Sequence, residues 1–574
     1  MSSPSPSPSL GHGARILANA RVRVLDDEGT IVEAIGFRAG RVAAVGTLAE
    51  VRAELMVRAE EVDLGGATVC PGFVDAHHHL ALAVTYGGLP EVRWPVCRSL
   101  ADVLAVVRAR AAVTPPGAWV TVYGYDEARL AELRRPTRDE LDAAAPEHPV
   151  LVIHHSFHEG VLGSRGLAAL GLSRSSAEPP GGRLGRGASG ELDGWVAERS
   201  FGPAEAAVRR ALLGADREGW FRAANDYQAR VLAAGITHLA DAAVPPSLEE
   251  LYGEWQRRGE LHLGVTMMPL VESIFAAPFE RLGGRPTGWS EGRLSIGALK
   301  LFADGGTSCA LCFRMRDALV QFGQMLARTV RERSTVAWRL ARDQPFRIDA
   351  RLAIHTGFRL YEPATLAHVL RAADERGFAV AVHAGGNEAV EEVAAIWSSR
   401  GASAGGAALP RRIEHLFFAN RDTARRAADA GVHAVVQPAH LDETGAIVVA
   451  SGLPGKLGFH PYRTLLDAGV RLAGSSDAPV NTFDVWSAVR AAVERRLADG
   501  RPVFPSEALA VREVLHMYTR GGAAALGMAG EIGQLRVGAR ADAVVLAADP
   551  WELEVERIGE AKILATYTGG ERRV

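Results

Sequence analysis

Eight short apolar segments recur along the middle of the chain and constrain its fold more than any other feature. They lie at residues 73–77, 237–241, 263–267, 298–302, 379–383, 412–415, 434–437 and 471–475. Helix-like stretches separate most of them, for example residues 363–376 and 423–430. Strand and helix alternating eight times is the pattern of a parallel (β/α)8 barrel. We therefore predict an α/β fold with a TIM-like barrel over residues 71–528.

The chain is longer than such a barrel needs. It has 574 residues, which leaves room for inserts and a flanking unit. An insert is predicted at about residues 80–230, after the first barrel strand. A second, helical insert is predicted at about residues 309–350, in a stretch rich in Arg, Leu, Val and Ala. Three roles stay open for this second insert. It could cover the pocket, mediate self-association, or lie on the surface without a function.

Both ends of the chain have the pattern of short strands and turns. Residues 14–70 and 529–574 alternate apolar and polar side chains between Gly- and Asp-rich turns. Neither piece has enough apolar positions to fold alone, so we predict one small β-sandwich built from both. Residues 1–13 begin with a Ser/Pro repeat, which is typical of a disordered tail.

Composition excludes several classes of partner. The formal net charge is -3, which provides no electrostatic surface for nucleic acid or an anionic membrane. No long apolar run and no secretory signal are present, so we expect neither a membrane span nor secretion. The chain has only 4 cysteines, which favours a reducing, cytoplasmic location over a disulfide framework.

The first barrel segment ends in three histidines. Side chains alternate in direction along a strand, so His77 and His79 share a face while His78 points the other way. Two imidazoles on one face can chelate one metal ion. Asp75 lies on the same face one step earlier and is predicted to brace the site. Loop histidines without a metal are the alternative for this stretch alone.

Other predicted strands also end in residues of the metal-ligand type. Lys300, His383, His415 and Asp477 lie at or near the ends of four later segments. The C-terminal ends of barrel strands carry the active site, so the fold would bring these residues to one rim. A single histidine at a strand end is more often structural. Several such ends together predict a metal centre.

These residues stand within motifs that resemble the amidohydrolase superfamily, and the branch that contains N-substituted formamide deformylases. The motifs lie at residues 71–79 (PGFVDAHHH), 300–306 (KLFADGG), 382–387 (VHAGGN), 412–415 (RIEH), 475–480 (SSDAPV) and 533–542 (GQLRVGARAD). The resemblance covers nearly the whole chain. It is specific for the superfamily and much less specific for the substrate.

A two-metal site is the chemistry that we expect. His77 and His79 would hold one ion with Asp477, and His383 and His415 a second; the expected metal is zinc. A lysine ammonium has no lone pair, so Lys300 can join only if it is neutralised or, as the resemblance implies, carboxylated to a bridging carbamate. The alternative is a structural Lys300 paired with a carboxylate such as Asp304.

The predicted activity is hydrolysis of a C–N bond in a small amide or N-acyl molecule by metal-activated hydroxide, with N-formyl compounds included. Asp477 is the predicted catalytic residue, which takes a proton from water and passes it to the leaving nitrogen. Hydrolysis of a cyclic amide, carbamate or ester stays open. So does a metal-binding barrel without activity and with a regulatory role.

Three further residues are weaker candidates for substrate contacts. His158 and His440 could contact substrate or steady an oxyanion, and each could equally be a loop residue. Tyr125 could line the mouth of the pocket, although a packing role fits it somewhat better. The expected partner is a small-molecule substrate, and homo-oligomerisation stays open.

Overall fold

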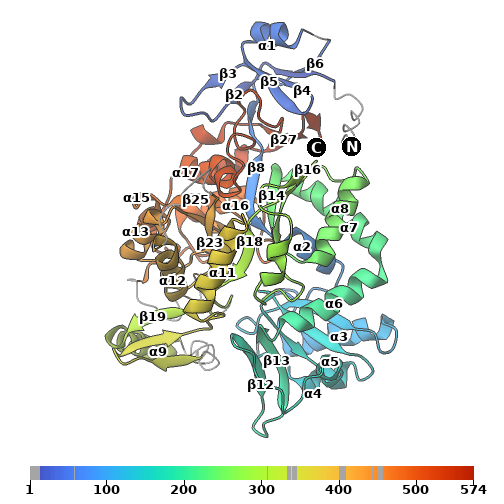
Figure 1. The fold of residues 1–574 in the computed structure, drawn as a ribbon, viewed down its shortest axis with the longest axis vertical. Coiled ribbons are helices and arrows are strands. Elements are labelled where there is room, and N and C mark those ends of the chain that lie inside the picture. The colour runs from blue at the N-terminus through green and yellow to red at the C-terminus, as the bar shows by residue number, and fades with distance from the viewer. Residues whose placement is uncertain are drawn as a thin grey trace.

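The computed structural model describes residues 13–56, 58–306, 308–332, 338, 345–399, 409–441, 445, 448 and 457–574. The tail predicted over residues 1–13 lies outside the described residues, apart from Gly13. The strands of the chain ends gather at one pole of the molecule, and the two inserts lie at the other (Figure 1). Among the described residues, no helix is long and apolar enough to cross a membrane.

Two five-stranded sheets form the centre of the molecule. The first has the order β16-β17-β15-β14-β8 and the second the order β18-β22-β23-β24-β25. Their strands are β8 (Phe73–His78), β14 (Ile236–Val244), β15 (Gly264–Pro269), β16 (Ser290–Glu291), β17 (Leu294–Ile296), β18 (Leu299–Phe302), β22 (Val380–Ala384), β23 (Arg411–His415), β24 (Val432–Val436) and β25 (Arg471–Gly474). All eight predicted segments are strands, and each runs parallel to its neighbours.

The hydrogen bonding forms two sheets rather than one closed ladder. No strand pairing joins the first sheet to the second within the described ranges. The backbone N–H of Asp477 donates to the His77 carbonyl oxygen at 2.8 Å, which links the edges that follow β25 and β8. The strand positions are therefore confirmed, whereas closure of the barrel stays a prediction.

Strands β8, β22 and β24 are buried along their whole length, as parallel strands covered on both faces are. Gly72 lets β8 lie close to β14, because a Cβ atom there would come within 2.1 Å of the Thr237 side chain. The surrounding helices are α7 (Arg217–Ala233), α8 (Pro246–Arg257), α11 (Pro363–Glu375), α12 (Asn387–Ser398), α13 (Arg421–Asp429), α15 (Tyr462–Asp467), α16 (Val485–Glu494), α17 (Val511–His516) and α18 (Gly522–Ala525). Short helical turns are η1 (Phe279–Gly283), η2 (Pro438–His440), η4 (Pro505–Glu507), η5 (Met517–Gly521), η6 (Pro550–Glu552) and η7 (Val555–Glu560).

The two ends of the chain pair with each other. One sheet has the order β5-β4-β1-β6 and the other the order β28-β27-β26-β7-β2-β3. Their elements are β1 (Arg15–Ala18), β2 (Arg21–Arg23), β3 (Ile31–Val32), β4 (Ala34–Arg38), β5 (Arg41–Gly46), α1 (Leu48–Leu55), β6 (Glu60–Asp63), β7 (Thr68–Pro71), β26 (Ala543–Leu546), β27 (Ile563–Thr568) and β28 (Glu571–Arg572). Val22 and Val42 share one buried cluster with Val545 and Tyr567, so both ends contribute to one core.

The long stretch after β8 forms a sheet of its own. Its order is β12-β13-β11-β10-β9, and helices lie beside it. The elements are α2 (Leu80–Tyr86), α3 (Leu100–Val113), β9 (Val120–Tyr125), α4 (Arg138–Ala144), β10 (Val150–His154), β11 (Glu159–Leu162), α5 (Ser164–Ala169), β12 (Gly182–Arg186), β13 (Leu192–Glu198) and α6 (Gly202–Ala215).

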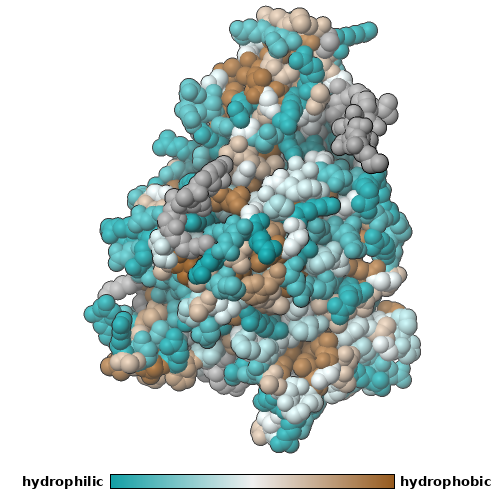
Figure 2. Space-filling model, viewed as in Figure 1, coloured by the Kyte–Doolittle hydropathy of each residue, from teal (hydrophilic) through white to brown (hydrophobic). Residues whose placement is uncertain are grey.

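The second insert is not purely helical, which corrects the prediction for residues 309–350. Helix α9 (Met315–Glu332) is accompanied by a three-stranded sheet of β19 (Leu311–Arg314), β20 (Phe346–Ile348) and β21 (Ala353–Thr356). Its residues 333–337 and 339–344 lie outside the described ranges. Leu319, Val320 and Leu326 of α9 are exposed, and brown atoms mark this region in the space-filling view (Figure 2).

The shared core of the chain ends can be tested at one strand. Val545 is 1% exposed and pairs with Val69 of β7, whereas Val537 is 59% exposed. We expect Val545→Ala to lower the free energy of unfolding by about 2 kcal/mol, because it removes buried methyl groups and leaves a cavity. The matched control Val537→Ala should change it by less than about 0.5 kcal/mol. Equal urea unfolding curves for the two variants would contradict a core shared by both ends.

Candidate metal centre

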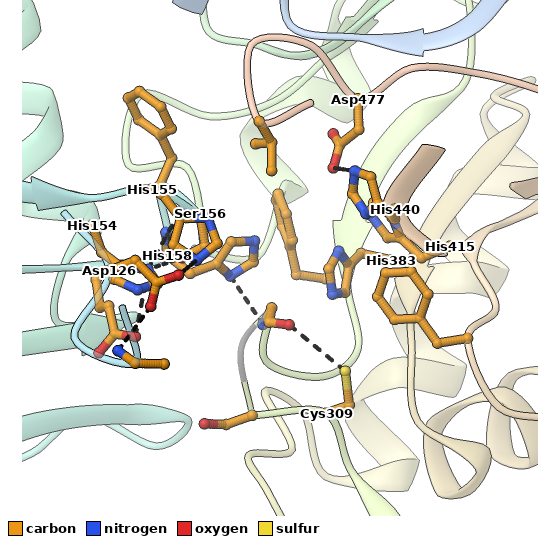
Figure 3. Close-up of a pocket in the computed structure, with 18 of the residues that line it drawn as sticks. Asp126, His154, His155, Ser156, His158, Cys309, His383, His415, His440 and Asp477 are labelled. Atoms are coloured by element: carbon orange, nitrogen blue, oxygen red, sulfur yellow. Dashed lines mark hydrogen bonds and ion pairs between the residues drawn. The ribbon is translucent and has the colours of Figure 1, made fainter. Parts of the chain in front are cut away.

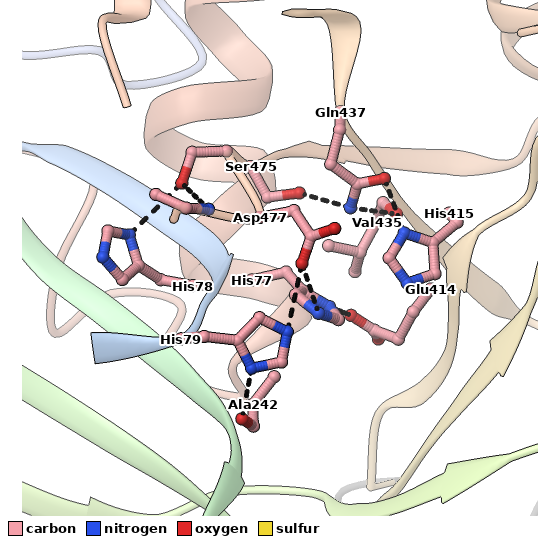
Figure 4. A network of polar contacts seen from close by, with 12 residues as sticks. His77, His78, His79, Ala242, Glu414, His415, Val435, Gln437, Ser475 and Asp477 are labelled. Atoms are coloured by element: carbon pink, nitrogen blue, oxygen red, sulfur yellow. Dashed lines mark hydrogen bonds and ion pairs between the residues drawn. The ribbon is translucent and has the colours of Figure 1, made fainter. Parts of the chain in front are cut away.

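Two imidazoles at the end of β8 face one carboxylate. Nε2 of His79 lies 3.1 Å from Oδ1 of Asp477, and Nε2 of His77 lies 3.4 Å from the same oxygen. Ligand atoms of these three residues all lie within 4.8 Å of one another. Figure 4 shows both rings turned toward Asp477, as the alternation along β8 predicts.

Hydrogen bonds fix the orientation of these rings. Nδ1 of His77 lies 2.5 Å from Oε2 of Glu414, and Nδ1 of His79 lies 2.7 Å from the carbonyl oxygen of Ala242. Both partners are acceptors, so the ring hydrogen sits on Nδ1 and the lone pair on Nε2 faces Asp477. A metal-ligating histidine commonly donates its other nitrogen in this way.

The donor set fits a divalent cation. Nε2 of His77 and Oδ1 of Asp477 are buried atoms without a hydrogen bond, and so are Nζ of Lys300 and Nε2 of His383. Burial lowers the pKa of His79, so its ring is neutral. Imidazole lone pairs that face a carboxylate oxygen at 3.1 and 3.4 Å repel it unless a positive ion lies between them. The residues present therefore fit the predicted metal.

The second pair of predicted ligands lies next to the first. The ring centroids of His383 and His415 are 4.4 Å apart, and those of His77 and His415 are 4.9 Å apart. Nδ1 of His415 donates to Oε1 of Gln437 at 2.9 Å. Burial lowers the pKa of His383 and His415 well below the ordinary histidine value, which keeps both rings neutral for ligation.

The backbone is bent where it delivers two of these side chains. His415 has a φ of 72° and Asp477 a φ of 59°, both in the left-handed region. Such conformations cost of order 1–3 kcal/mol per residue and gather at functional sites. They bring the last residue of β23, His415, and a residue that follows β25, Asp477, inward to the cavity.

Lys300 is a buried amine at the same place. Burial lowers its pKa to about 8, and its Nζ makes no hydrogen bond. Among the described residues no salt bridge joins Lys300 to Asp304, whose carboxylate instead accepts from the backbone N–H groups of Ala310, Gly385 and Gly386 at 2.8–3.0 Å. Nζ of Lys300 lies 4.8 Å from the centroid of the Phe302 ring and is thus a buried amine without a hydrogen bond, which can take up carbon dioxide when it is neutral.

Sequence analysis missed the carboxylate that orients His77. Glu414 is fully buried and accepts from Nε and Nη2 of Arg412 at 2.9 Å each. Although burial opposes ionisation, Arg412 holds the pKa of Glu414 far below its ordinary range. The signal was present in β23, where residues 412 and 414 are two apart and share a face.

The role predicted for Asp75 is corrected. Its carboxylate contacts Nδ1 of His78 at 2.9 Å and accepts from the backbone N–H of Ser476 at 2.9 Å. It therefore fastens β8 to the segment that carries Asp477, and the rings of His77 and His79 are held by other groups.

The metal centre opens into a cavity of about 1260 Å³. Apolar side chains from the first insert and from α9, such as Phe157 and Phe322, line it together with His158 and His440. Nε2 of His440 lies 3.6 Å from Oδ2 of Asp477. Figure 3 shows His158 between the His154 end and the His383 end of this cavity.

Tyr125 does not line the cavity, so the packing role that the sequence favoured holds and its weaker candidacy for a substrate contact does not. Its side chain is fully buried in the apolar cluster beneath α3, and its ring packs edge-on against His154. A tyrosine at the end of an apolar strand cannot be assigned to pocket or core from the sequence, because both faces of that strand are covered.

A second group of ligand-type residues lies at the far end of the cavity. Glu127, His154 and Glu159 have ligand atoms within 4.8 Å of one another. Although burial opposes charging, Glu127 raises the pKa of His154 to about 9. The His154 imidazolium and Arg135, which lies 3.8 Å from Glu159, together balance the two carboxylates, so this group has less need of a metal than the His77–His79–Asp477 group.

Comparison with known proteins agrees with this geometry. Residues 60–574 match the Amidohydrolase family. The chain belongs to this family. It is 29% identical to an N-substituted formamide deformylase from Arthrobacter pascens, over 97% of this chain and 98% of that protein. It is also 25% identical to Protein LONG AFTER FAR-RED 3 from Arabidopsis thaliana, over 97% of this chain and 91% of that protein.

A solved structure supports the fold of this amidohydrolase. A metal-dependent hydrolase from Pyrococcus horikoshii OT3 superimposes with a TM-score of 0.68 at 22% identity, covering 95% of this chain and 99% of that one. The family match confirms the resemblance inferred from the motifs, and the protein is a hydrolase of the amidohydrolase type. Members of this family generally use a divalent metal.

The unpaired amine at the centre predicts a pH dependence of the metal-free protein. The unfolded chain protonates Lys300 below about pH 10.5, whereas the folded chain does so only below about pH 8. Between these values the unfolded state binds more protons, so the free energy of unfolding rises with pH, by up to about 3 kcal/mol. Lys300→Met should lack this rise in urea titrations at pH 8 and 10. Identical pH slopes for both proteins would show that the amine is paired or exposed.

Proposed function

We propose that this amidohydrolase cleaves the C–N bond of a small amide or N-acyl compound, and that N-formyl amides are among its substrates. The proposal is carried by one observation: at one end of a cavity, His77, Lys300, His383 and Asp477 each place a buried nitrogen or oxygen atom that makes no hydrogen bond and could bind a metal. The likeness to a deformylase over almost the whole chain supports the substrate class.

The proposed metal centre is dinuclear. His77 and His79 with Asp477 would hold one divalent ion, and His383 and His415 the other, while Lys300 as a carbamate would bridge them. Zinc suits a set of imidazoles and carboxylates. When bound, the two ions would supply Lewis-acid chemistry, which acidifies water and polarises the carbonyl group of the substrate.

The protein's own residues would move the proton. The Asp477 carboxylate would accept a proton from the attacking water. It then delivers that proton to the leaving nitrogen. His440, 3.6 Å from Oδ2 of Asp477, is positioned to contact the carboxylate or the substrate. The apolar cavity wall would hold the substituent on the nitrogen.

The proposal includes the domain organisation. Residues 71–528 would act as one (β/α)8 barrel, and residues 14–70 and 529–574 as one β-sandwich. The backbone hydrogen bond between Asp477 and His77, and the cluster shared by the two ends, support this division.

Location and partners are also proposals. Cys70, Cys97, Cys309 and Cys312 are free thiols, which supports a reducing compartment such as the cytoplasm. The partner is a small-molecule substrate. A homo-oligomer through the exposed apolar face of α9 would account for Leu319 and Leu326.

Lys300 is the residue that tests the proposed centre. We expect Lys300→Ala to lose bound metal and activity together, because no bridging anion remains, and added bicarbonate should not restore either. A short carboxylic acid in solution should restore part of the activity by filling the vacated space. Lys300→Arg should also fail, because a guanidinium stays charged and repels cations.

The measurements are metal content by mass spectrometry and turnover of a panel of formamides and acetamides. The matched control is Lys562→Ala, which removes an exposed lysine near β27. If Lys300→Ala kept two metals per chain and normal turnover, the proposed bridge would be wrong. Full metal loading without turnover of any amide, carbamate or ester would favour a regulatory barrel.

A further inference from the structure

His158 and Glu198 form an imidazole–carboxylate pair at the edge of the cavity, and both come from the first insert. His158 lies in the turn between β10 and β11, and Glu198 is the last residue of β13. The ring centroid of His158 is 5.2 Å from that of His383, a proposed metal ligand (Figure 3). The insert therefore extends to the reacting end of the cavity.

Hydrogen bonds hold this pair in place. Nδ1 of His158 lies 2.8 Å from Oε2 of Glu198. The backbone N–H of Gly306 is shared between Oε1 of Glu198 at 3.0 Å and Nδ1 of His158 at 3.1 Å. The backbone N–H of Glu198 donates to the carbonyl oxygen of His158 at 2.8 Å. Glu198 is 1% exposed, so its carboxylate has a fixed position.

The two glycines that follow Asp304 pack directly against this pair. A Cβ atom on Gly306 would come within 2.5 Å of the His158 ring, and one on Gly305 within 2.7 Å of Oε1 of Glu198. Any side chain at these positions would displace the pair. The packing of His158 and Glu198 thus accounts for glycine at both positions.

The backbone is strained on both sides of the contact. Phe157 has a φ of 58° and Glu198 a φ of 53°, in the region that residues with side chains rarely adopt. Strain of this kind costs about 1–3 kcal/mol and persists where the surrounding structure enforces it. Two such residues at one contact indicate that the surrounding structure holds His158 in position despite the free-energy cost of the strained backbone.

The carboxylate decides which ring nitrogen faces the cavity as an acceptor. The Glu198 carboxylate only accepts, and at 2.8 Å it lies nearer to Nδ1 than the Gly306 nitrogen does at 3.1 Å. The Gly306 N–H has its shorter hydrogen bond with Oε1 of Glu198, so the hydrogen of the His158 ring lies on Nδ1, between the ring and Glu198. Among the described residues no hydrogen bond to Nε2 of His158 is present, and the side chain lines the cavity. The lone pair of Nε2 is therefore offered to a bound molecule.

We propose that Nε2 of His158 accepts a hydrogen bond from the N–H of the scissile amide, and that Glu198 is the positioning residue that keeps Nε2 an acceptor. The site would then select N-monosubstituted amides, which carry an N–H, over N,N-disubstituted amides, which do not. This inference rests on the proposed function and deepens it by naming the substrate class.

Glu198→Gln tests the inference without a change of shape. The new side-chain carbonyl still accepts from Gly306, while its NH2 group donates to Nδ1 of His158 and moves the ring hydrogen to Nε2. The N–H on Nε2 then faces the N–H of the substrate and repels it, and Nε2 can no longer accept a hydrogen bond. We expect kcat/KM for formanilide to fall about ten- to hundredfold, the usual cost of an unpaired donor. For N-methylformanilide it should change less than about threefold.

The decisive quantity is the ratio of kcat/KM for formanilide to kcat/KM for N-methylformanilide. The two substrates differ in intrinsic reactivity, but this difference is the same for both proteins and cancels when the ratio of the variant is compared with that of the wild type. A purely structural role of Glu198 would lower both values together and leave the ratio unchanged. The double variant His158→Phe with Glu198→Gln keeps a ring in place and should lose the preference as well. Metal content and melting temperature, measured on each variant, identify any failure to fold.

The matched control is Glu388→Gln, because Glu388 contacts Nδ1 of His355 at 3.0 Å in the second insert. It should leave the formanilide ratio unchanged. If wild type hydrolyses formanilide and Glu198→Gln keeps the same ratio with full metal content, the inference is overturned while the proposed function stands. If metal-loaded wild type hydrolyses no amide, the proposed function fails and the inference fails with it.

Discussion

Acceptors that hold imidazole rings through Nδ1 are the interaction on which this site depends. Glu414, the Ala242 carbonyl and the Gln437 side chain orient His77, His79 and His415 in this way. Each ring is then left with a lone pair on Nε2. A polar atom that is removed from water and makes no hydrogen bond raises the free energy of the folded state. A cation among these lone pairs and the Asp477 carboxylate removes that cost, so the protein around the centre favours metal binding.

The same principle extends from the central sheets to the first insert. Glu198 holds His158 as Glu414 holds His77, but the available Nε2 faces the part of the cavity where substrate would lie. The insert thus contributes a polar contact to the substrate in addition to apolar side chains that line the cavity. The glycines after β18 connect the two parts, because only residues without side chains leave room for the pair.

The sequence predicts some of this arrangement well and some not at all. The alternation along β8 predicts that His77 and His79 share a face, and the strand ends predict which residues meet, because both follow from local geometry. The partners Glu414, Gln437 and Glu198 depend on contacts between segments far apart in the chain, which no local pattern encodes. Asp75 was misplaced for the same reason, since a buried strand gives no sign of which neighbour each side chain will meet.

The central claim, a dinuclear centre between the two central sheets, can be tested by anomalous X-ray scattering from crystals of the zinc-loaded protein. The account predicts two anomalous peaks about 3.5–4 Å apart. One should lie beside His77, His79 and Asp477 and the other beside His383 and His415, with density joining them to Nζ of Lys300. A single peak at this centre, or peaks only at the Glu127–His154–Glu159 group, would contradict it.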